Sequence, residues 1–187
     1  MKKIMMTIAA AMVAVTMNAQ DMYVGGSLGF STTTHDGNTL DTEFTFSPEF
    51  GISFSENAGV GLEFGYGRDE DKSGSTKVVT NALSVAPYFR WTPFHIGPVN
   101  LFADAKFRYG FAKVESDGQD AKTNTWGLYL QPGVAYNLND KFSLVAKFGD
   151  ILSYRSSKPD YSGAKSTNTF SALKLTNNIS FGFYYNF

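Results

Sequence analysis

Apolar residues fall on every second position through most of this chain, and this alternation restricts what the chain folds into. From Phe44 to Phe54 the even positions are apolar, and from Leu101 to Phe111 the odd positions are. A period of two predicts β-strands with one apolar face. The same pattern predicts eight strands, near residues 22–31, 43–54, 60–67, 82–91, 99–111, 126–136, 142–148 and 173–187. We therefore expect an all-β chain.

The predicted connections alternate in length along the chain. Short turns are expected at 55–58, 92–98 and 139–141, and longer polar loops at 32–42, 68–78, 113–124 and 153–169. Strands of this length, with short turns at one end and long loops at the other, are typical of an outer-membrane barrel. The sequence therefore predicts an eight-stranded antiparallel transmembrane β-barrel, with both termini and the short turns on the periplasmic side.

Residue size predicts which face of each strand points outward. Glycines such as Gly61, Gly65 and Gly133 lie on the face opposite the aromatic residues. The interior of an eight-stranded barrel is narrow, so the bulky apolar faces are expected to contact lipid. The alternative is a secreted soluble β-sandwich or lipocalin-like barrel, in which these apolar faces would form the core.

Aromatic residues gather near both ends of the predicted apolar faces. This is the expected position of the two aromatic girdles of a membrane barrel. The predicted periplasmic girdle contains Trp91, Tyr136, Phe142, Tyr185 and Phe187, and the outer girdle contains Phe30, Phe44, Tyr66, Tyr109, Phe111 and Trp126.

The N-terminal segment has the pattern of a signal peptide. Lys2 and Lys3 precede an apolar run over residues 4–15, and a small residue, Ala19, ends the segment. The run is too short for a spanning helix, which makes an N-terminal anchor the weaker interpretation. We predict a signal peptide over residues 1–19 and a single barrel domain over residues 20–187.

Composition excludes several classes of function. The chain has no cysteine, and its 16 basic residues nearly balance its 17 acidic ones without a basic cluster. Thiol catalysis and cysteine-based metal sites are therefore absent, and nucleic-acid binding is not expected. The charged run over residues 68–72, Arg-Asp-Glu-Asp-Lys, lacks the spaced oxygen ligands of a calcium loop. We expect no cofactor and no metal site.

The predicted inward faces carry acidic and basic residues in equal number. They are Glu43, Glu49, Glu63, Arg90, Asp104, Lys106, Arg108 and Lys147. Charges held away from water need partners, so this balance predicts an ion-pair network that plugs the lumen. The alternative is a gated polar pathway through the same residues, which would make the protein a narrow porin for small solutes or ions.

An enzymatic role would need a catalytic base near the outer rim. His35, next to Asp36, is the one candidate for a lipid A-modifying reaction, because His95 falls in a predicted periplasmic turn. A histidine in a polar loop is more commonly a solvated residue, so we expect no catalytic residue and no enzymatic activity.

The C-terminal sequence ISFGFYYNF, with Phe181, Phe183, Tyr185 and Phe187 on alternate positions, resembles the signal by which the barrel assembly machinery recognises its substrates. The whole chain resembles the small eight-stranded outer membrane β-barrel proteins of Bacteroidota, a porin-family group of the OmpA and OmpX type. This resemblance implies a monomer in the outer membrane of a Gram-negative bacterium, with a structural or surface-interaction role. It also implies contact with lipid and lipopolysaccharide, binding to the assembly machinery during insertion, and room for an extracellular ligand on the loops.

Overall fold

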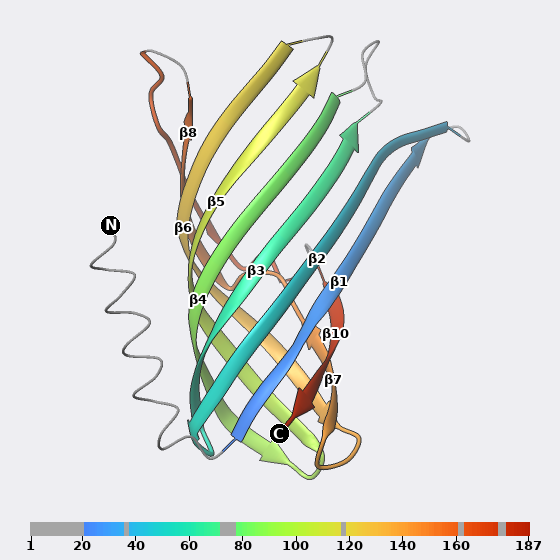
Figure 1. The fold of residues 1–187 in the computed structure, drawn as a ribbon, viewed down its shortest axis with the longest axis vertical. Helices are drawn as coiled ribbons and strands as arrows, with labels where there is room; N and C mark the ends of the chain where they lie inside the picture. Colours follow the sequence, from blue (N-terminus) through green and yellow to red (C-terminus); the bar gives the residue numbers. More distant parts are fainter. Residues whose placement is uncertain (1–20, 36–37, 72–77, 117–118, 161–162, 176–178) are drawn as a thin grey trace.

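The computed structural model describes residues 21–35, 38–71, 78–116, 119–160, 163–175 and 179–187. Within these residues every regular element is a β-strand. No helix in that part of the chain is long and apolar enough to cross a membrane. The strands, shown in Figure 1, are β1 (Asp21–His35), β2 (Asn38–Ser55), β3 (Ala58–Asp71), β4 (Val78–Ile96), β5 (Val99–Ser116), β6 (Gln119–Asn137), β7 (Phe142–Lys147), β8 (Leu152–Pro159), β9 (Thr167–Ala172) and β10 (Ser180–Asn186).

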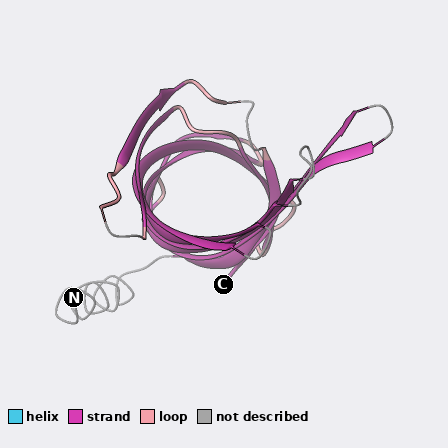
Figure 2. Cartoon of the chain, turned by 90° about the horizontal axis from the view of Figure 1, so that it is seen from above, coloured by secondary structure: helices cyan, strands magenta, loops and turns pink. Residues whose placement is uncertain are grey.

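Eight of these strands form a closed antiparallel ring. Strands β1 to β6 each pair with the next, β6 pairs with β7, β7 with β10, and β10 with β1. Seen from above, the strands form a round ring (Figure 2). The last seam runs from Tyr23 opposite Asn186 to Leu28 opposite Phe181. The predicted eight-stranded antiparallel barrel is therefore confirmed.

Strands β8 and β9 form a hairpin beside this ring, toward the end that carries the long connections. The lower part of β6, Gly133–Asn137, pairs with β7, whereas its upper part, Thr123–Leu130, pairs with β8. The prediction of one continuous strand over residues 173–187 is wrong. Leu173 has a φ of 56°, in the left-handed region, so the regular strand β9 ends at Ala172, although the Leu173 and Lys174 amides still donate to the carbonyls of Ile151 and Asp150; β10 begins at Ser180.

Two of the segments predicted as long loops, 32–42 and 113–124, are mostly strand, and the described residues of a third, 68–71 and 78, are also strand. The β1–β2 register continues to His35 opposite Asn38, and the β5–β6 register continues to Ser116 opposite Gln119. Figure 1 shows these hairpins rising together at one end of the barrel. The apolar alternation stops in their upper parts, but the backbone ladder continues there. The predicted fourth loop also contains β8 and part of β9.

The two faces of the barrel wall differ as the alternation predicts. Outward aromatic side chains are exposed, Phe30 at 72% and Phe107 at 44%, whereas the inward residues Asp104 and Glu49 are only 0% and 3% exposed. The alternative of a soluble barrel with an apolar core is therefore wrong. Both predicted aromatic girdles lie on the outward face, and in the short-turn girdle the rings of Phe142, Tyr185 and Phe187 pack edge to face.

Candidate functional site

The strand register places the inward charged residues in two neighbouring rows. Glu49 on β2 lies opposite Glu63 on β3, and Arg90 on β4 lies opposite Asp104 on β5. Two like charges placed side by side repel, so the glutamate pair requires cations from other strands. Lys147, at the end of β7, is one of them.

Arg90 forms the most complete of these ion pairs. Its Nε donates to Asp104 Oδ1 at 2.7 Å and its Nη2 donates to Asp104 Oδ2 at 2.8 Å, which is a bidentate pair. The same Nη2 also donates to the Tyr184 hydroxyl at 3.0 Å and lies 3.7 Å from Glu49 Oε2. Arg90 therefore joins β4 to β2, β5 and β10.

Aromatic rings surround the Arg90 guanidinium. Its Cζ lies 3.9 Å from the ring centre of Phe102 and between 5.2 and 5.3 Å from those of Tyr23, Tyr88 and Tyr184. Guanidinium groups bind aromatic faces favourably, most of all when desolvated. The hydroxyl groups of Tyr23 and Tyr88 are 2.7 Å apart and share a hydrogen bond across the lumen. The four aromatic rings form a cage that fixes the position of the Arg90 guanidinium.

Glu63 accepts contacts from three cations. The Nζ of Lys106 donates to Oε2, the Nζ of Lys147 lies 3.1 Å from the same oxygen, and the Nη2 of Arg108 donates to Oε1 at 3.2 Å. Lys147 Nζ is also 2.7 Å from Glu49 Oε1. These contacts link the two rows into one buried cluster, which we call the lumen network.

The structure brings together all seven residues of the predicted lumen network. They are Glu49, Glu63, Arg90, Asp104, Lys106, Arg108 and Lys147. Six of them are buried, and the side chain of Arg108, which follows Lys106 along β5 toward the long connections, remains 36% exposed. Glu43, the eighth predicted charge, lies nearer that end, opposite Asp69.

Glycines on neighbouring strands make room for the inward rings. Tyr23 lies opposite Gly51, and a Cβ added to Gly51 would come within 2.1 Å of the tyrosine ring. Phe102 packs in the same way on Gly133. Each large ring lies in the space that the missing side chain leaves, which allows several rings to fill a narrow barrel.

Sequence reasoning missed two members of the site. The odd position of Tyr23 in β1 predicts that its side chain points inward, but the sequence does not indicate that it belongs to the site. Asp150 lies in the short break between β7 and β8 and interacts electrostatically with Arg108 and Lys106. No sequence pattern marks Asp150 as part of the site, because the alternation predicts only a strand directly before it, over residues 142–148.

The residues of the enzymatic alternative are not gathered into a site. His95 is exposed near the short turns, with Nδ1 2.9 Å from Asn100 Oδ1. The side chain of His35 and the whole of Asp36 lie outside the described residues. Across the described part of the chain, no three histidine, cysteine, aspartate or glutamate side chains are placed to hold a metal ion.

The predicted C-terminal assembly signal lies on and just after β10. Phe181, Phe183 and Phe187 are exposed on the outward face, and Tyr185 packs between the rings of Phe142 and Phe187. The Phe187 amide donates to the Met22 carbonyl at 2.8 Å, which ties the chain end to β1. These positions leave the row of rings accessible from the outside of the barrel.

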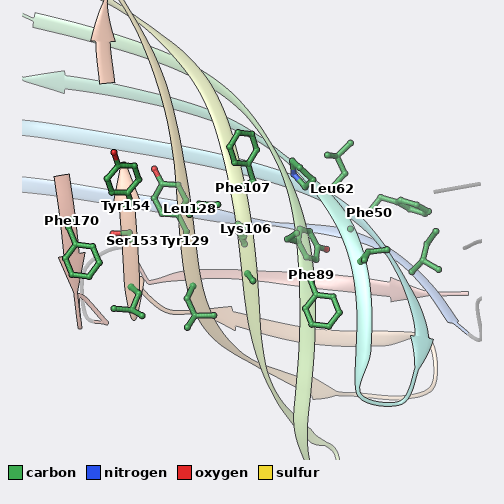
Figure 3. A pocket seen from close by; sticks show the side chains of 18 residues that line it. Phe50, Leu62, Phe89, Lys106, Phe107, Leu128, Tyr129, Ser153, Tyr154 and Phe170 are labelled. Atoms are coloured by element: carbon green, nitrogen blue, oxygen red, sulfur yellow. The ribbon is translucent and has the colours of Figure 1, made fainter. Parts of the chain in front are cut away.

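An apolar groove runs across the outward faces of successive strands, from β2 through β3, β4, β5, β6 and β8 to β9 (Figure 3). Its outward-facing lining includes Phe50, Leu62, Phe89, Phe107, Leu128 and Phe170. An apolar surface of this extent is compatible with hydrocarbon rather than water.

Comparisons with known proteins agree with this geometry. The family model described as outer membrane protein beta-barrel domain matches residues 4–187. Among solved structures, Neisserial surface protein A is similar with 17% identity and a TM-score of 0.53, over 89% of this chain and 97% of that one. OprG from Pseudomonas aeruginosa is similar with 17% identity and a TM-score of 0.53, over 90% and 96% of the two chains.

A major outer membrane protein from Thermus thermophilus has 15% identity and a TM-score of 0.53, over 89% of this chain and 98% of that one. None of these names states an enzymatic activity. No curated protein matches the sequence. At these identities the structural likeness supports the fold alone.

Proposed function

The chain belongs to the outer membrane protein beta-barrel domain family, and from that premise we propose that its lumen is closed by the lumen network and that the barrel has a structural or surface-binding role. It is an outer membrane β-barrel protein. In that setting the short turns face the periplasm and the long hairpins face outward.

The observation that carries the proposal is an ion pair across the full width of the barrel. In the eight-strand ring, β3 and β7 are four positions apart in either direction, and Glu63 on β3 pairs with Lys147 on β7 at 3.1 Å. Arg90 on β4 and Tyr184 on β10 are joined across the ring in the same way, at 3.0 Å. Side chains that meet across the diameter support a lumen that is closed at that depth.

We expect the folded wild-type chain to be electrically silent. Single-channel recording in a planar bilayer at high salt should show no unitary openings, because ions would have to separate buried charge pairs to pass. The double variant Glu63→Ser with Lys147→Ser removes both ends of the cross-barrel pair and should give small unitary openings.

A matched control removes the same charges elsewhere. Glu56→Ser with Lys141→Ser changes two exposed residues near the short turns and should stay silent. Insertion is checked beforehand by the heat-dependent shift in gel mobility. Steady openings of the wild-type protein would contradict closure and would favour the alternative, a narrow porin for small solutes or ions.

The extended hairpins support the surface-binding part of the proposal. On β5 and β6 the paired strands continue past the outer girdle residues Phe111 and Trp126 as far as Ser116 and Gln119. Strands paired by hydrogen bonds hold their side chains more rigidly than an irregular loop does. The outer end of the barrel therefore offers ordered polar surface to an extracellular ligand.

The proposed orientation predicts a difference in labelling. The chain has no cysteine, so a single introduced cysteine reports one position. A membrane-impermeant maleimide should label Lys122→Cys, at the hairpin end of β6, in intact cells. Lys141→Cys, in the turn before β7, should be labelled only after the envelope is broken. The reverse pattern would place the short turns outside.

The remaining partners belong to the same proposal. The row of Phe181, Phe183, Tyr185 and Phe187 is proposed as the contact for the barrel assembly machinery, and the outward apolar faces as the contact for lipid and lipopolysaccharide. The absence of an enzymatic activity, the monomeric state and an origin in Bacteroidota remain predictions.

A further inference from the structure

Two arginines and a tyrosine meet on the outer side of the lumen network. Arg108 on β5, Gly127 on β6 and Arg155 on β8 lie opposite one another in register. Strands are roughly 4.8 Å apart, so the two arginine backbones are about 10 Å apart across Gly127. Gly127 has no side chain, and the ring of Tyr129 lies over it, with its hydroxyl 2.8 Å from where a Cβ would be.

These side chains have hydrogen-bond donors that the described residues do not use. The Nε of Arg108 is buried without a partner, while its guanidinium lies 4.8 Å from the ring centre of Tyr129. Arg155 is exposed and forms no ion pair within the described part of the chain. Buried donors without partners are uncommon in folded proteins.

The local charge is positive. The lumen network holds four bases and three acids, Asp150 adds a fourth acid beside Arg108, and Arg155 adds a fifth base. Asp150 and Arg155 also both interact electrostatically with Tyr129. These groups together leave one positive charge at the outer side of the network, on β5, β6 and β8, whereas the acidic residues Glu43 and Asp69 lie nearer the outer end on β2 and β3.

The next register row outward leaves room above these donors. It contains Gly110, Thr125 and Ser157, whose side chains are small, and the two hydroxyl oxygens of Thr125 and Ser157 lie 3.0 Å apart. Along β5, β6 and β8, a molecule entering from the outer end of the barrel would therefore meet small side chains first and the arginines below them.

We propose that Arg108, Tyr129 and Arg155 form a binding site for a small oxyanion, either a carboxylate or a phosphate monoester, that enters from the outer end of the barrel. Guanidinium groups bind such oxyanions through paired, charge-assisted hydrogen bonds, and the tyrosine hydroxyl supplies a further donor between them. The site lies outside the cross-barrel ion pair, so it does not depend on whether the lumen conducts.

The test is titration calorimetry of the folded chain in a phosphate-free neutral detergent, with sodium phosphate as the probe and sodium chloride at equal ionic strength as the reference. Phosphate should bind saturably. Arg155→Gln should weaken the affinity by about tenfold, the loss expected for one charge-assisted hydrogen bond. Tyr129→Phe should weaken it less, Arg155→Lys should restore part of it, and Asp150→Asn should strengthen it.

The matched control is Lys158→Gln on the same strand. Lys158 is exposed and lies one position out of phase with Arg155 and Ser157, so it points to the opposite face, and its loss should leave the affinity unchanged. Mixed micelles with phosphatidic acid distinguish the source, because a lipid ligand would displace phosphate whereas a free solute site would not respond. No saturable binding by the wild type, or equal weakening in Lys158→Gln, would overturn the proposal.

Discussion

Replacing Glu63 by glutamine is expected to lower the free energy of unfolding by about 3–5 kcal/mol, the range for removing one partner of a buried ion pair. Glu63 is buried, and its carboxylate contacts Lys106, Lys147 and Arg108. The glutamine side chain has nearly the same volume, so the loss is electrostatic rather than a cavity. Urea unfolding of the chain in lipid vesicles measures the effect.

Two further variants test whether the loss of stability in Glu63→Gln comes from the buried ion pairs and not from removing a carboxylate in general. Glu56→Gln removes an exposed carboxylate from the turn between β2 and β3 and should change the unfolding free energy by less than about 0.5 kcal/mol. Adding Lys106→Met to Glu63→Gln removes one of the cations left without a counter-charge and should restore part of the stability. If Glu63→Gln were as stable as the wild type, the buried pairs would not be formed in the membrane.

Replacing Leu130 by arginine is expected to destabilise the barrel by about 2–4 kcal/mol, the range measured for arginine on the lipid face near the bilayer midplane. Leu130 lies on the outward face of β6, between the girdle residues Trp126 and Tyr136, and lines the apolar groove. The guanidinium would have to enter hydrocarbon or distort the bilayer to reach water.

The depth dependence of this effect provides the control. Leu138→Arg changes an exposed leucine just after β6, beyond the short-turn girdle, where the same substitution should cost about 0–1 kcal/mol. Folding into detergent-free vesicles, followed by urea titration, compares the two variants. Equal stability of Leu130→Arg and Leu138→Arg would mean that the outward face does not contact lipid.

The sequence was sufficient to assign the faces of the barrel wall. Alternation has the same period as the side chains of a strand and residue size indicates which face is inward, so the inward positions of Glu49, Glu63 and Asp104 could be predicted. It was not sufficient to pair the charges. Glu63 and Lys147 are 84 residues apart on opposite strands of the ring, and only the register of every intervening strand brings them together.

The errors have a common physical origin. Leu173 and Leu175 continue the apolar alternation of the last strand, yet neither lies in a regular strand and their backbone hydrogen bonds join them to Ile151 and Gly149, because alternation describes side chains and not the partner of the backbone. In the outer hairpins the opposite occurs, since hydrogen-bonded pairing continues through residues that show no alternation. Apolar alternation and backbone strand pairing coincide only where one face of a strand is apolar and the other faces the interior of the barrel.

The seam between β1 and β10 also determines the step of folding at which the sheet closes into a barrel. The wall closes through contacts between the first and last strands of the described chain, from Tyr23–Asn186 to Leu28–Phe181. Contacts of such long sequence separation form late and slowly in folding. Until β10 arrives, β1 and β7 are open sheet edges that would pair with other chains. We therefore expect a chain that lacks only β10 to aggregate through these two edges instead of closing.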